Sequence, residues 1–89
     1  MRQHLRARRV ELRAGDELGK LRDALLTKAA EPEHYVEMEA IASAELAAKK
    51  GDGKKVFEAL SKAGKWSLSV AEKIGIGVAT AAIKTSLGI

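Results

Sequence analysis

The chain has 89 residues, a formal net charge of +4 and no cysteine. This length allows one small domain that buries only somewhat more than about 60% of its unfolded surface, so association would add to a modest stability. Without cysteine the sequence excludes a disulfide framework, a thiol nucleophile and a Cys-based zinc site, and a reducing compartment is the default. The Arg-rich start has no apolar run after it, so we expect no secretory signal and a cytoplasmic location.

The composition favours packed helices, because aromatic residues make up only 3% of the chain and Ala, Leu, Val and Ile supply most of its apolar content. We expect one all-α domain over residues 1–89, a small bundle of three to four helices. Charge alternates along it: residues 1–15 are basic, 16–48 acidic and 49–65 basic again. Such alternation supports pairing within the chain or between subunits as easily as an anionic ligand.

Residues 1–30 predict one long helix. Leu18, Leu21 and Leu25 follow the spacing of a single helix face. Gly15 and Gly19 each cost about 1 kcal/mol relative to Ala inside a helix, so a bend there, or a start after Asp16, is the alternative. A second face carries the candidate anion-binding residues: Arg2, Arg6, Arg9 and Arg13.

Pro32 predicts the start of a second helix over residues 32–50, since proline suits a first helical turn. Apolar residues form two strips along this helix, one with Tyr35 and Leu46 and one with Val36, so we expect it to be covered on both sides. The Gly51-Asp52-Gly53 segment should end it and cap a third helix, over residues 53–63, that buries Val56, Phe57 and Leu60.

Residues 65–88 predict a central apolar helix, because the run from Ile74 to Ile83 carries no charge. Around a helical wheel, bulky residues form one ridge and small residues a second ridge beside it, which favours a helix held between neighbours. The expected interaction surface combines both ridges: Trp66, Val70, Ala71, Ile74, Gly75, Val78, Ala79 and Ala82.

Catalytic and metal chemistry find little support in the sequence. His34 lies among Glu31, Glu33 and Glu37, but no second histidine or cysteine falls at ligand spacing, so a solvated helix start is favoured over a metal site. No serine has a nucleophile context, and no glycine-rich phosphate loop is present. We therefore expect a non-enzymatic protein without catalytic residues, cofactor or metal.

Two alternative functions remain open. The last helix could act on membranes as an amphipathic effector, although its uncharged run of 10 residues is shorter than the about 20 apolar residues that span a bilayer. The Arg stripe could bind nucleic acid, although no aromatic residue interleaves with it to stack on bases. We favour a partner protein, either a second copy of the chain or a larger protein.

Part of the sequence resembles a known family. The carrying motifs are Ala-Lys-Lys-Gly-Asp-Gly-Lys-Lys-Val at residues 48–56, Gly64-Lys65-Trp66, Lys73-Ile74-Gly75 and the closing Leu87-Gly88. Over Ala47 to Gly88 they are similar to the C-terminal helical tail of bacterial abortive-infection proteins of the AbiTii type. The resemblance implies a role in anti-phage defence, alone or with a larger defence protein, and assigns no catalytic residue.

Overall fold

The computed structural model describes the backbone of residues 2–89 and the side chains of residues 13–89. Within residues 2–89 the regular structure is entirely helical, which confirms the all-α class, with five helices instead of three or four. The helices are α1 (Arg2–Lys28), α2 (Pro32–Lys49), α3 (Gly53–Leu60), α4 (Lys65–Ile74) and α5 (Gly77–Leu87).

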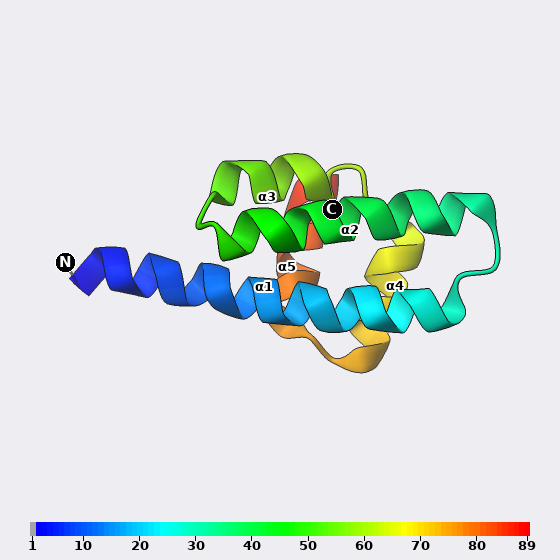
Figure 1. Cartoon of the computed structure of the whole chain (residues 1–89), viewed down its shortest axis with the longest axis horizontal. Helices are drawn as coiled ribbons and strands as arrows, with labels where there is room; N and C mark the ends of the chain where they lie inside the picture. The colour runs from blue at the N-terminus through cyan, green and yellow to red at the C-terminus, as the bar shows by residue number, and fades with distance from the viewer. Residues whose placement is uncertain (1) are drawn as a thin grey trace.

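The two long helices form an antiparallel hairpin on which the others assemble. In Figure 1, α1 and α2 lie side by side, α3 runs along α2, and the short helices α4 and α5 lie behind the hairpin at a steep angle to it. Helix α4 contacts α1 and α2, whereas α5 contacts α1 and α3. The resulting body is elongated, 45 × 22 × 21 Å between Cα atoms.

The core is aliphatic and every helix contributes to it. The largest apolar side chains with no exposed surface are Leu18, Leu21, Leu25, Ile41, Leu60 and Ile83. Small residues between them, such as Ala44 and Ala71, are also fully buried, so the helices approach one another closely. The three leucines of α1 are those that the predicted helix face contained.

Helix α1 is continuous through both of its glycines, as predicted. A Cβ atom at Gly15 would lie 3.3 Å from Cγ of Lys49, and one at Gly19 would lie 3.0 Å from Oε2 of Glu45. Both glycines therefore face α2 at points of close approach. Their cost in helix propensity is offset by the close packing of α1 against α2, which a larger residue at either position would disturb.

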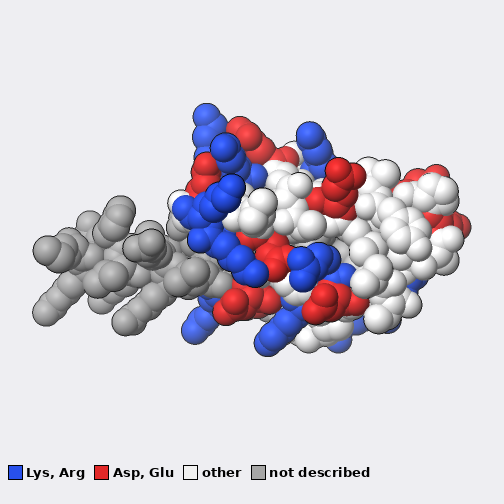
Figure 2. Space-filling view, in the orientation of Figure 1, with Lys and Arg blue, Asp and Glu red and all other residues white. Residues whose placement is uncertain are grey.

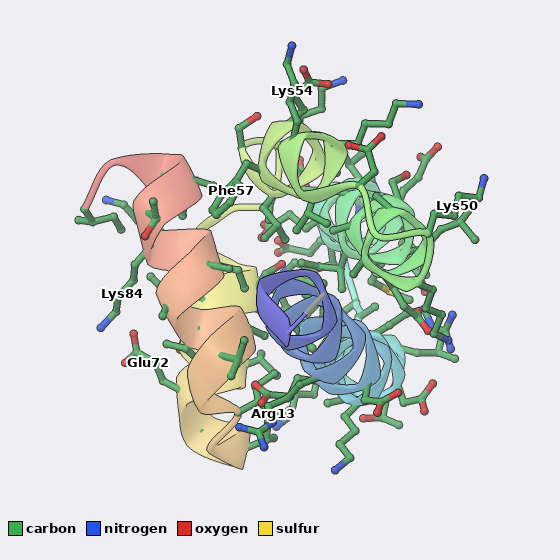
Figure 3. All side chains as sticks on the ribbon, turned by 90° about the vertical axis from the view of Figure 1, so that its left-hand side faces the viewer. Arg13, Lys50, Lys54, Phe57, Glu72 and Lys84 are labelled. Carbon is green, nitrogen blue, oxygen red and sulfur yellow. The ribbon has the colours of Figure 1, made fainter. Side chains whose placement is uncertain are left out.

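The predicted boundaries of α2 and α3 are confirmed at their key residues. Pro32 is the first residue of α2, and the Asp52 side chain accepts a hydrogen bond of 3.2 Å from the Lys55 backbone N–H at the start of α3. The prediction for Phe57 is wrong, because this side chain is 46% exposed. Figure 3 shows Phe57 on the side of α3 that faces α5.

The prediction of one central helix over residues 65–88 is also wrong, because the segment divides into α4 and α5. Gly75 adopts φ +75°. The backbone N–H groups of Gly75 and Ile76 both donate hydrogen bonds to the Ala71 carbonyl, at 3.1 and 3.4 Å. This left-handed glycine ends α4. The break turns Ile76 into the core and lets both short helices pack against α1.

Candidate functional site

The eight residues of the predicted interaction surface do not share one surface. Val70, Ala71 and Ala79 are core residues, with 3%, 0% and 0% of their surface exposed. Trp66, Val78 and Ala82 are half-buried, and only Ile74 and Gly75 are exposed. The break at Gly75 rotates α5 relative to α4, so the two ridges of the helical wheel do not continue from one helix into the next.

Trp66 and His34 form a stacked pair that joins α4 to the start of α2. Their ring centroids are 3.8 Å apart and the rings are inclined by 14°. Nδ1 of His34 accepts hydrogen bonds from the backbone N–H groups of Ala30 and Glu31, at 3.1 and 3.4 Å. His34 is thus held as a helix cap, and among the described residues no group of three or more His, Asp or Glu side chains is arranged to hold a metal ion.

Two carboxylates cap helices that lie elsewhere in the fold. Oε1 of Glu37, in α2, accepts hydrogen bonds from the backbone N–H groups of Gly64 and Ser67, at 2.8 and 3.1 Å, and from the Ser67 hydroxyl, at 2.8 Å. Oε1 of Glu17, in α1, accepts one of 2.9 Å from the Ala79 backbone N–H. The N-termini of α4 and α5 have no side-chain cap of their own, so these acids satisfy donors that would otherwise lack partners.

A third carboxylate is clamped between α1 and α2. Glu45 is 5% exposed, with Arg22 Nη1 2.8 Å from its Oε1 and Lys49 Nζ 2.8 Å from its Oε2. Removing either cation would leave a buried charge with incomplete compensation. Three acids of the block, Glu17, Glu37 and Glu45, therefore connect one helix to another.

The candidate anion-binding stripe is described only in part. The side chains of Arg2, Arg6 and Arg9 lie outside the described residues, and Arg13 is exposed. Near Arg13 the turn between α2 and α3 adds basic residues, and Figure 2 shows Lys and Arg gathered over this end of the body. In Figure 3, however, Lys54, Lys50 and Arg13 point in three different directions, so the positive charge surrounds this end and does not line one face.

A surface that carries exposed apolar side chains lies on the outside of α2, and we call it the α2 outer face. Its six residues are all exposed: Tyr35, Val36, Glu39, Ser43, Leu46 and Lys50. Tyr35, Val36 and Leu46 expose 55%, 62% and 57% of their surface. The expected coverage of α2 on both sides is therefore wrong, because α1 and α3 cover only part of its circumference.

A groove of about 710 Å³ adjoins this face, between α2 and α3. Val36, Glu39, Ala40 and Ser43 line its α2 side. Beyond α2 the lining is Ala59 with the polar and charged residues Lys55, Glu58, Ser61 and Lys62. A smaller hollow of about 240 Å³ continues toward the α2–α3 turn and includes Leu46. Figure 3 shows α4 and α5 on the opposite side of α1 from α2, so neither helix covers the groove.

The sequence contained a signal for this face that we interpreted wrongly. Two apolar strips on α2 indicated two covered sides, but Tyr35 and Leu46 of the first strip are more than half exposed, and only Met38 of that strip packs against the core. The inter-helix caps had only an indirect signal. Gly64 and Ile76, the residues before α4 and α5, have no side chain that can cap a helix. The caps of these two helices therefore come from acidic residues of other helices.

None of the described helices is both long enough and apolar enough to cross a bilayer. Ile76, Ala79 and Ile83, from the uncharged run, are buried in the fold.

Comparisons with protein-family models, with curated proteins and with solved structures each gave no match to this chain.

Proposed function

We propose that this chain is a non-enzymatic helical interaction module of a bacterial abortive-infection system against phage, acting in the cytoplasm. In this proposal it docks to a larger defence protein or to another copy of itself. The observation that carries the proposal is the α2 outer face, where three large apolar side chains are exposed on one helix. Val36 and Leu46 line two hollows that share Ser43 and Ala59, and apolar surface that is joined in this way is typical of protein interaction sites.

The proposed absence of catalysis is supported by how the polar side chains are used. Glu37 is occupied by Gly64 and Ser67, and Glu45 by Arg22 and Lys49. Carboxylates such as these two could act as acids or bases in an active site, but here they connect helices. The proposal accordingly assigns no catalytic residue and no cofactor.

The defence role is supported by the resemblance of residues 47–88 to the tail of AbiTii-type proteins. The resembling motifs fall at boundaries of the fold: Gly51 and Asp52 between α2 and α3, Gly64 before α4, and Gly75 after it. They are the residues that turn the chain.

The proposal is tested by expressing the chain with the proteins encoded beside it in its bacterium. We expect co-purification with one of them, or self-association, and a lower efficiency of plating of phage. Leu46→Glu should abolish both effects, because it places a charge in the middle of the docking face. The matched control is Leu26→Glu on α1, where the side chain is 60% exposed but lies outside that face.

A complex and protection that survive Leu46→Glu would overturn the use of this face. A wild-type chain that neither associates with any protein nor lowers plating would overturn the function itself. Circular dichroism should show unchanged helicity in both variants, because both leucines are exposed.

Nucleic-acid binding is the second candidate, and the basic end of the molecule supports it (Figure 2). Binding through phosphates predicts an affinity for duplex DNA or RNA that falls steeply with salt and falls again when Arg6 and Arg9 are changed to Ala. An affinity that changes neither with salt nor with the two substitutions would rule out nucleic-acid binding.

A further inference from the structure

The α2 outer face differs from the other exposed helix surface of the hairpin in its lack of charge. The exposed residues of α1 between positions 13 and 28 are mostly ionic: Arg13, Asp16, Lys20, Arg22, Asp23, Leu26, Thr27 and Lys28. On the α2 outer face only Glu39 and Lys50 are charged, one acid and one base. Over the right-hand part of α2 the surface in Figure 2 is mostly white. A helix face that meets only water is normally richer in charge.

The two charges on this face have no ion-pair partner among the described residues. Glu39 and Lys50 are eleven positions apart, about 16 Å along the helix, and differ by only about 20° around it. They therefore lie on one line along α2 but are too far apart to pair with each other. Both are exposed, so each is free to pair with an opposite charge on a second molecule.

We infer that the α2 outer face is the interface with a second copy of this chain, packed antiparallel across a two-fold axis between Ser43 and Leu46. In this arrangement position 39 of each copy faces position 50 of the other. Glu39 then pairs with Lys50 of the second copy, and symmetry forms the pair twice. This inference deepens the proposed function and rests on it, because it names the partner of the same face.

The apolar residues fit the same arrangement. Leu46 lies next to the two-fold axis, so the leucines of both copies meet there. Ser43 and the half-buried Ala42, close to the axis on the same helix, are small enough to admit them. The groove along α3 is then closed by the second copy, which removes Val36 from water. Antiparallel α2 helices also oppose their dipoles favourably.

The charge pattern favours a second copy over a lipid surface. An anionic membrane attracts a face whose charges are basic, whereas this face carries one acid, Glu39, for its one base, Lys50. A line with one acid and one base, placed evenly about its midpoint, is complementary to itself when reversed. An isologous interface requires this property.

Charge reversal tests the arrangement directly. Glu39→Lys and Lys50→Glu should each turn a dimer into a monomer in sedimentation velocity at micromolar concentration, because each places like charges opposite one another twice. Mixing the two variants in equal amounts should restore a dimer that contains one copy of each. In the mixed dimer both pairs are opposite in charge again, and the double variant E39K/K50E should dimerise by itself.

The controls carry the same charge changes away from the face. Asp23→Lys and Lys20→Glu, at exposed positions of α1, should leave the dimer intact. Leu46→Glu should give a monomer that no charge reversal rescues. Circular dichroism should report the same helicity in every variant, which would show that a monomeric variant is still folded.

The possible results separate this inference from the proposed function. A wild-type chain that is monomeric at all concentrations, or a dimer that Glu39→Lys and Lys50→Glu leave unchanged, overturns the antiparallel interface. If such a chain still binds a defence protein through Leu46, the proposed function stands without it. A dimer that obeys the charge rules but gives no protection against phage upholds the interface and overturns the defence role.

Discussion

At the scale of single residues, carboxylates hold this small fold together. Glu37 gathers three donors around one oxygen, and two of them come from Ser67, which has no exposed surface. Only a Gly at position 64 allows this approach, since a Cβ atom there would lie 2.7 Å from the carboxylate. The cap and the glycine form one unit.

Replacement of Glu37 should therefore cost more than its position near the surface indicates. We expect Glu37→Ala to lower the free energy of unfolding by about 2 kcal/mol, because it removes a cap and leaves buried donors of Ser67 without partners. Chemical denaturation monitored by circular dichroism measures the change. Glu33→Ala, at an exposed position of the same helix, should stay within about 0.5 kcal/mol. Equal effects for both variants would contradict the role of the cap.

At the scale of elements, the turn between α4 and α5 decides the shape of the C-terminal third. Gly75 and Gly77 both have open space around them, since a Cβ atom at either position would meet no atom within 4 Å. They differ in backbone conformation: Gly75 has φ +75°, and Gly77 begins α5 without a positive φ. The pair separates conformational cost from crowding.

We expect Gly75→Ala to destabilise the protein by about 1 kcal/mol, because an L side chain is strained in the left-handed region. Gly77→Ala should be neutral or stabilising by up to about 1 kcal/mol, since it restricts the unfolded chain and suits a helix. Thermal unfolding of the two variants gives the comparison. Destabilisation by Gly77→Ala as large as that by Gly75→Ala would show that crowding, not φ, governs this turn.

The sequence predicted where helices begin better than it predicted which of their faces are covered by other helices. Pro32 and Asp52 marked boundaries correctly because proline and capping residues act locally. Gly75 was missed as a boundary because a glycine inside an apolar run fits both a close contact and a helix end. The exposure of Tyr35 and Leu46 was missed because an apolar strip looks the same whether its partner belongs to the chain or to another molecule.

At the scale of the whole molecule, the helices form two layers with unequal support. The hairpin of α1 and α2, with α3 beside it, packs along its length, whereas α4 and α5 rest on it as short helices (Figure 1). Two carboxylates, Glu17 and Glu37, tie the second layer to the first. We infer that α4 and α5 open before the hairpin does.

Amide hydrogen exchange can test this order. We expect slower exchange in α1 beyond Arg13 and in α2 than in α4 and α5. Glu37→Ala should speed exchange in α4 by about tenfold or more and leave the hairpin nearly unchanged, since a tenfold change corresponds to about 1.4 kcal/mol. Acceleration that is uniform over all helices would indicate a single cooperative unit instead.

The contact between Glu37 and Gly64 also limits how the sequence can change over evolution. A residue with a side chain at position 64 would displace the carboxylate, and loss of the carboxylate would remove the reason for a glycine. Neither position can drift alone without passing through a less stable protein. Relatives of this chain are therefore expected to keep both residues or to replace both, although 27 positions separate them.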